Sequence, residues 1–237
     1  MVFDGCFVTG TDTGVGKTLV SAALLHTLAR HHARVVGMKP VAAGLVQQGG
    51  AWVAEDALAL RAASTVAVPP ALDNPVALPE PLSPHLAAAR AGRRVGVAEL
   101  VVAHRGLRRL ADVVLVEGSG GWRVPLNDSE TLADLAVALA LPVVLVVGLR
   151  LGCLNHALLT AEAIRADGLH LAGWVANTVD PAMACRDENI QTLRQRLTAP
   201  LLGVVPWQLD TPDARQIVLD LPEPWQSKEN HELAERI

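Results

Sequence analysis

A glycine-rich segment, GTDTGVGKT at residues 10–18, constrains the fold of this 237-residue chain more than any other feature. It follows a short apolar run and precedes an amphipathic helical pattern over residues 17–30. Glycines let successive backbone N–H groups point at phosphate oxygens, and the start of a helix adds favourable partial charge for an anion. The segment therefore predicts a P-loop in which Lys17 reaches the β- and γ-phosphates of ATP and the Thr18 hydroxyl binds Mg²⁺. It departs from the usual motif at Thr11, which stands in the place of the first glycine.

Short apolar runs alternate with helical patterns along most of the chain. The predicted strands lie at 6–9, 35–38, 113–116, 143–147, 171–176 and 201–205, and the predicted helices at 17–30, 97–110, 132–139, 153–166 and 187–197. Hydrophobic residues make up 51% of the chain but aromatic residues only 3%, an aliphatic balance that suits a buried parallel sheet. The alternation predicts a single-domain, P-loop NTPase-like α/β fold, with a mostly parallel sheet and helices on both faces. We expect this domain at 1–221 and a polar tail at 222–237.

Charge and composition argue against several classes of function. The formal net charge is −4 and no dense Lys/Arg run occurs, which disfavours nucleic-acid binding. No apolar run reaches the roughly 18 residues that span a bilayer, so we expect no membrane partner. Cys6, Cys153 and Cys185 form no CxxC pair, and no secretory signal is evident, which favours a reducing, cytoplasmic compartment. The eight histidines are scattered, which disfavours zinc.

Charged residues stand where predicted strands end. Glu117 follows the run 113–116 and precedes the glycine-rich residues 118–121, where P-loop proteins place an acidic residue that holds Mg²⁺ directly or through water. Lys39 ends the run 35–38, and we expect it to point out of the same sheet edge, where such folds bind ligands. The alternatives are a purely structural turn at 118–121 and a solvated surface lysine at 39.

Two stretches, 42–55 and 68–84, break the alternation of strands and helices. The first is rich in glycine and glutamine, and the second contains six prolines. Both are predicted to be long excursions from the sheet, which are often functional in compact domains. Asp56 follows the first excursion at the start of a short predicted helix, where it is a candidate metal ligand or a helix N-cap.

Several motifs resemble the dethiobiotin synthase family in their order and spacing. They are FVTGTDTGVGKT, MKPVAAG, EDALAL, LSPH, VLVEGSGGWRVPL, VGLRLGCLNH, GWVAN and GVVPW, and they extend roughly from Phe7 to Pro212. LGCLNH and GWVAN are much more specific than the P-loop. The resemblance implies a homodimer that uses ATP and Mg²⁺ to close the ureido ring of dethiobiotin, in biotin biosynthesis, from 7,8-diaminononanoate and CO₂.

The same resemblance implies roles for individual residues. Lys39 and Lys17 are the implied catalytic cations. The implied ATP-binding residues are Gly14, Val15, Gly16, Lys17, Thr18, Asp56, Glu117, Gly118, Ser119, Gly120, Asn177, Thr178, Pro206, Trp207, Gln208 and Asp213. The implied substrate-binding residues are Thr13, Lys39, Leu151, Gly152 and Asn155, of which the last three receive the substrate carboxylate across the dimer. The implied Mg²⁺ ligands are Thr18, Asp56 and Glu117.

A second class of function shares this fold, namely a nucleotide-driven switch or partner-binding ATPase. Partitioning ATPases carry an extra lysine five residues before the GKT lysine, where this chain has Asp12, and GTP-binding switches need an NKxD motif that it lacks. Both observations favour the enzyme. Two departures from the dethiobiotin synthase pattern remain: Ala43 stands where members often have Ser, and Gly14 where some have Glu. We interpret both as tuning, because neither changes a lysine or a metal ligand.

Overall fold

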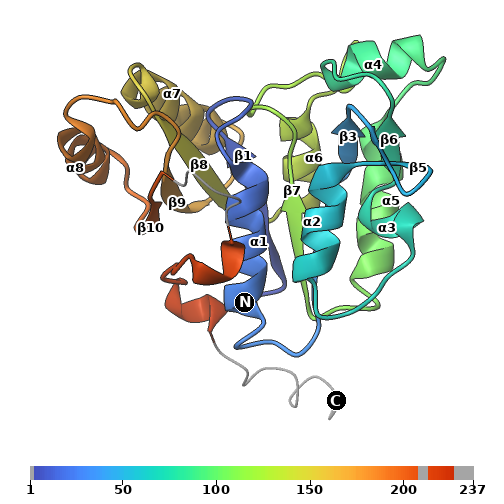
Figure 1. Ribbon diagram of the computed structural model, residues 1–237, viewed down its shortest axis with the longest axis horizontal. Coiled ribbons are helices and arrows are strands. Elements are labelled where there is room, and N and C mark those ends of the chain that lie inside the picture. Colours follow the sequence, from blue (N-terminus) through green and yellow to red (C-terminus); the bar gives the residue numbers. More distant parts are fainter. Residues whose placement is uncertain (1–2, 208–212, 227–237) are drawn as a thin grey trace.

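A six-stranded sheet forms the centre of the fold, and all its strands are parallel, in the order β10-β9-β8-β1-β7-β2 (Figure 1). The structure is a computed structural model that describes residues 3–207 and 213–226. Its strands are β1 Gly5–Gly10, β2 Val35–Met38, β7 Val113–Glu117, β8 Val143–Leu149, β9 Leu171–Thr178 and β10 Leu201–Val205. All six predicted strands are confirmed, and four of them extend beyond their predicted carboxyl ends.

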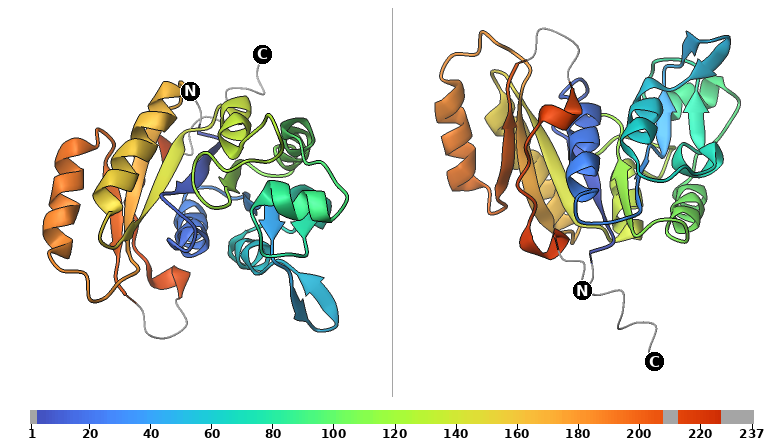
Figure 2. Two further views of the ribbon diagram at one scale, coloured as in Figure 1. Left: turned by 90° about the horizontal axis from the view of Figure 1, so that it is seen from above. Right: turned by 60° about the horizontal axis from the view of Figure 1, so that its bottom comes forward.

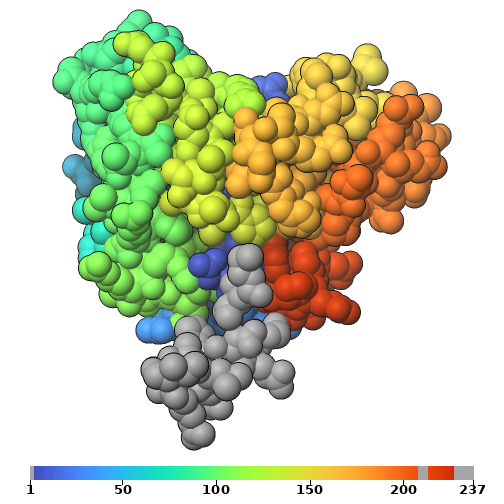
Figure 3. Space-filling view, turned by 180° about the vertical axis from the view of Figure 1, so that it is seen from behind, coloured from blue at the N-terminus to red at the C-terminus, as the bar shows by residue number. Residues whose placement is uncertain are grey.

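Helices cover both faces of this sheet (Figure 2). The helices α1 Lys17–Leu28 and α2 Glu55–Ala63 pack on one face, and α5 Val97–Leu107, α6 Leu132–Leu139, α7 Cys153–Ala166 and α8 Arg186–Arg196 pack on the other. Figure 3 shows this second face, where α5, α6 and α7 lie side by side. Successive residues of β7 point to opposite faces of the sheet. Val113 and Leu115 therefore pack on the face covered by α1 and α2, and Val114 and Val116 pack on the face covered by α5 to α8. The predicted P-loop NTPase-like α/β fold is confirmed.

The two excursions from the sheet contain short regular elements that the sequence did not reveal. β3 Val41–Ala43 pairs in parallel with β6 Val76–Leu78, and β4 Val46–Gln48 forms an antiparallel hairpin with β5 Ala51–Val53. Two short helices, α3 Pro70–Asp73 and α4 Pro84–Arg90, each begin with a proline. Strands of three residues are too short to show a periodic pattern, and β6 is flanked by prolines.

The segment after β10 returns to the face covered by α1. It contains two short 3₁₀ turns, η1 Ala214–Gln216 and η2 Glu223–Trp225. Trp225 is 4% exposed and stacks on Phe3, with ring centroids 4.4 Å apart. The first residues of the segment expected to be a polar tail therefore pack against the domain, and residues 227–237 lie outside the described part. Within the ranges 3–207 and 213–226, no helix is both long and apolar enough to cross a membrane.

Candidate active site

The P-loop connects β1 to α1 and is held against the neighbouring strands. Gly14 and Gly16 have φ values of 73° and 85°, in the left-handed region that favours glycine. The Asn177 side chain, at the end of β9, donates a 2.8 Å hydrogen bond to the Val15 carbonyl. A Cβ on Gly16 would lie 2.1 Å from Asn177 Nδ2, so a side chain is excluded there. The loop thus takes one conformation with its backbone open towards a ligand.

Four side chains from four elements meet beside the P-loop. Lys39 Nζ lies 2.7 Å from Glu117 Oε1 and 2.7 Å from Asp56 Oδ2, and it donates to the Gly118 carbonyl at 3.2 Å. The Thr18 hydroxyl lies 2.9 Å from Asp56 Oδ1 and 2.9 Å from Glu117 Oε1. An ammonium group has three protons, and here three oxygens accept them. Lys39 is therefore fully hydrogen-bonded within the chain.

Burial decides between the alternative roles of these residues. Lys39 is 3% exposed and Glu117 is fully buried, so the interpretation of Lys39 as a surface lysine is wrong. The N-cap role considered for Asp56 is also wrong, because α2 is capped at Ala54 and the Asp56 carboxylate contacts Thr18 and Lys39 instead. The parallel strands end at one edge of the sheet, which brings these polar groups together. Their mutual contacts there offset the cost of burying them.

The charges in this cluster shift one another's pKa values. Desolvation works against the ammonium of Lys39, but the Glu117 and Asp56 carboxylates outweigh it and raise its pKa. Burial, followed by the positive charge of Lys39, lowers the pKa of Lys17 to about 8. Burial opposes ionisation of Asp56, yet its ion pair with Lys39 and its contact with Thr18 lower its pKa. The site therefore holds one firmly protonated lysine, Lys39, and a second lysine, Lys17, whose ammonium donates to the Asp12 carbonyl at 3.1 Å.

The oxygen atoms of this cluster suit a hard divalent cation. Glu117 Oε2 is buried and has no hydrogen-bond partner among the described residues, so this oxygen is available to bind a cation. Thr18 Oγ lies 2.9 Å from both Asp56 Oδ1 and Glu117 Oε1. Mg²⁺ is usually held by one or two carboxylates, with water and phosphate oxygens completing its octahedron. In the described part of the chain, no three His, Cys, Asp or Glu side chains gather to hold a metal without such help.

A cavity of about 960 Å³ opens over the P-loop and these charged groups. The cavity is lined by Thr13, Gly14, Gly16, Lys17 and Thr18 of the P-loop, by Lys39, Asp56, Glu117, Ser119 and Gly120, and by Ala43, residues 81–84 and residues 123–125. Residues 81–84 and 123–125 were not among the residues predicted for the site. The LSPH motif, which contains Ser83, was the one available signal for the former.

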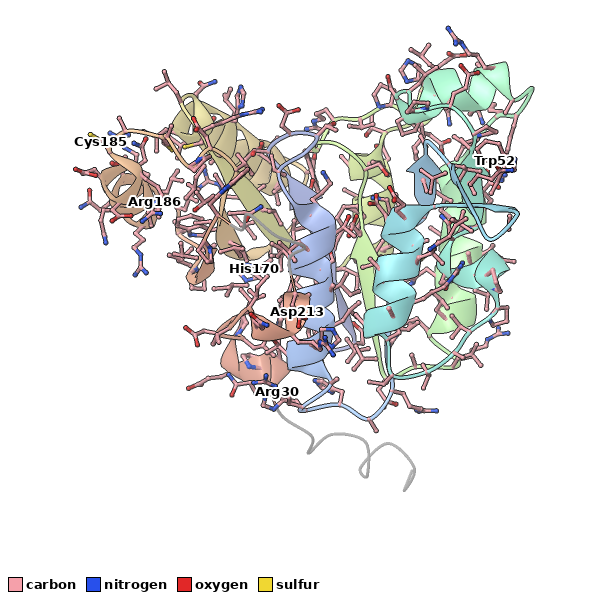
Figure 4. All side chains as sticks on the ribbon, viewed as in Figure 1. Arg30, Trp52, His170, Cys185, Arg186 and Asp213 are labelled. Carbon is pink, nitrogen blue, oxygen red and sulfur yellow. The ribbon has the colours of Figure 1, made fainter. Side chains whose placement is uncertain are left out.

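Other residues implied by the resemblance lie outside this cavity. Thr178 is buried at the end of β9, and Pro206 and Trp207 follow β10. Asp213 accepts hydrogen bonds from Arg215 at 3.0 Å and lies beside α1 (Figure 4). Gln208 lies outside the described residues.

The segment Leu151–Asn155 lies at the surface, at the start of α7. Leu151 is 94% exposed, and Asn155 is exposed one turn into the helix. Gly152 is the N-cap, with a φ of 96°, and no side chain caps the helix start. Asn155 therefore lies near the helix cap, and among the described residues no side chain caps the first N–H groups of α7.

One ion pair at the P-loop was not predicted. The Asp12 carboxylate pairs with Arg150 at the end of β8 and accepts a 2.7 Å hydrogen bond from the Thr13 N–H. Asp12 therefore orders the backbone of the P-loop and connects it to the turn before α7. Only the fold brings these two residues together, because they are 138 positions apart.

The P-loop, the buried Lys39 and the paired carboxylates define a P-loop NTPase-like protein. The chain belongs to the AAA_26 family, whose model, described as an AAA domain, matches residues 4–215.

Solved structures share this fold at low sequence identity. A ParA family ATPase from Chlorobium tepidum TLS is 11% identical with a TM-score of 0.54, over 87% of this chain and 85% of that one. The septum site-determining protein MinD from Pyrococcus horikoshii OT3, complexed with Mg-ADP, is 19% identical with a TM-score of 0.52, over 87% and 82% of the two chains. The cell division protein FtsY from Thermotoga maritima is 16% identical with a TM-score of 0.51, over 94% and 67%.

Proposed function

We propose that this protein is an ATP- and Mg²⁺-dependent cyclo-ligase that forms dethiobiotin from 7,8-diaminononanoate and CO₂. The observation that supports this proposal is the single cavity, which is lined by the phosphate-binding loop and also by Ala43 and residues 81–84. Such a cavity has room for a small organic substrate beside the γ-phosphate. The motifs shared with dethiobiotin synthases suggest which substrate that is.

The proposed chemistry needs cations and no protein nucleophile. One amine of the substrate captures CO₂ as a carbamate, whose oxygen attacks the γ-phosphorus as the bond to the departing ADP breaks. The second amine then attacks the carbamoyl carbon, the C–O bond to phosphate breaks, and a proton passes to solvent. Charge accumulates on the transferred phosphoryl group, where Lys17 and Lys39 would neutralise it. Thr13 lines the cavity beside the P-loop and is placed to orient the carbamate.

Mg²⁺ would be held by Thr18, Asp56 and Glu117 together with phosphate oxygens. When bound, the ion neutralises the β- and γ-phosphates and orients them for transfer. Its ligands would include the two carboxylates that accept hydrogen bonds from Lys39. A carboxylate that turned towards the cation would leave an N–H of Lys39 available for a phosphoryl oxygen.

The proposal includes a homodimer with two shared sites. The exposed Leu151 and the uncapped start of α7 point to a surface completed by another molecule. A twofold axis would place the same segment of each subunit against the cavity of its partner. The N–H groups at the start of α7 suit the substrate carboxylate.

The test is an assay with ATP, Mg²⁺, the diamine and ¹⁴C-bicarbonate, followed by identification of the labelled product. We expect one ADP and one phosphate per dethiobiotin, with little ADP formed when the diamine is omitted. Phosphate release that ignores the diamine and responds only to a protein partner would instead support the switch ATPase. Asp12, at the position of the partitioning lysine, is paired with Arg150 and unavailable for that role.

A further inference from the structure

Ser119 lines the cavity, and its hydroxyl connects the segment after β7 to β3. Ser119 follows β7, and its Oγ donates a 2.6 Å hydrogen bond to the carbonyl of Val41 at the start of β3. Ala43, two residues further along β3, lines the same cavity with only a methyl group. Ser119 therefore provides a polar atom on this part of the wall.

The hydrogen bond to Val41 determines what Ser119 can bind. A serine hydroxyl has one proton and two acceptor lone pairs. Because the proton is donated to a backbone carbonyl, the side chain is left as an acceptor towards the cavity. Phosphate and carboxylate oxygens are also acceptors and gain nothing from such a group. An N–H of an amine is the complementary partner.

The neighbouring cation does not compete for this acceptor. Lys39 Nζ already donates to Glu117, Asp56 and the Gly118 carbonyl, the residue next to Ser119. The proposed function assigns any N–H of Lys39 that Mg²⁺ binding releases to a phosphoryl oxygen, so the Ser119 acceptor remains available to an N–H of the ligand.

We infer that Ser119 binds an amine N–H of the substrate, an inference that rests on the proposed function. The resemblance groups Ser119 with the ATP-binding residues. Because the hydroxyl proton is donated to Val41, the side chain can only accept a further hydrogen bond, and we assign it to an N–H of the diamine instead. Because Ala43 lies on the same wall, Ser119 takes the place of the hydroxyl that is absent at position 43.

The test compares Ser119→Ala, Ser119→Ala/Ala43→Ser and the parent in steady-state assays with diamine and ATP varied separately. Loss of one neutral hydrogen bond should raise the KM for the diamine about 3- to 10-fold and leave the KM for ATP unchanged. The second substitution should reverse most of that rise. Ser129→Ala, an exposed serine outside the cavity, is the matched control and should behave as the parent.

Three results would overturn the role of Ser119: a parental KM for the diamine in Ser119→Ala, a rise in the KM for ATP instead, or no reversal by Ala43→Ser. Melting temperatures, measured for each variant, separate a lost contact from a weakened fold, because a fold effect would not be reversed at position 43. A parent that makes no dethiobiotin would overturn the proposed function, and this inference with it.

Discussion

Replacing Lys39 with methionine tests the buried charge cluster most directly. A surface lysine could be replaced at little cost, but Lys39 is 3% exposed and neutralises Glu117, which is fully buried. Without it, Glu117 retains only the Thr18 hydroxyl, and its Oε2 is already without a partner among the described residues. Removing one member of a buried ion pair costs about 3–5 kcal/mol. We expect Lys39→Met to lower the free energy of unfolding by about this amount in the absence of nucleotide.

A second substitution separates stability from catalysis. Glu117→Gln removes the unpaired charge, so Lys39→Met/Glu117→Gln should regain most of the lost stability. Activity should stay at least 10²-fold below the parent in both variants, because no cation replaces Lys39 beside the phosphoryl group. Urea denaturation of parent, single and double variants, with product formation measured in parallel, gives the complete cycle. A Lys39→Met variant as stable as the parent would refute the ion-pair reasoning, and one that is fully active would refute the catalytic role.

Three further predictions concern the P-loop and the dimer. The pKa of Lys17 is lowered to about 8, so the folded protein loses this positive charge above that pH while the unfolded chain keeps it. The free energy of unfolding of the nucleotide-free protein should therefore rise between about pH 8 and 10. ADP affinity, measured by fluorescence titration, should fall over the same interval, and a flat profile would contradict the assignment of Lys17. Arg150→Ala breaks an exposed ion pair with Asp12 and should raise the KM for ATP about two- to fivefold, whereas Arg150→Lys should not. An equal mixture of inactive Lys17→Ala and Asn155→Ala subunits should recover about a quarter of parental activity, because half the dimers then carry one intact site. No recovery after proven subunit exchange would mean that each site lies within one chain.

Much of the architecture could be predicted because its signals are local. The strands β2 and β10 and the helices α6 and α7 have the boundaries expected from apolar runs and helical spacing. A parallel sheet requires crossovers, so the order of strands and helices also determined that all strands end at one edge. The short strands β3 to β6 could not be predicted, because each depends on its partner strand for pairing.

The contacts of single polar side chains were harder to predict than the part of the fold in which these residues lie. Lys39 and Asp56 each had a structural alternative, and burial and contacts excluded it. Asp12 and Arg150 are far apart in sequence, so no spacing pattern links them. The position of Asp213 beside α1 likewise depends on the path of the chain after β10.

By itself, the sequence predicted that this chain forms a phosphate-binding loop between a buried strand and a helix, and that Lys39 and Glu117 lie at the same edge of a parallel sheet. Those conclusions depend on backbone chemistry and periodicity, which act over a few residues. Only the tertiary structure decided that Lys39 is buried against two carboxylates, and that the Ser119 proton is committed to Val41. A hydrogen bond or an ion pair between distant residues depends on where folding places both partners, and that placement is a property of the whole packed chain.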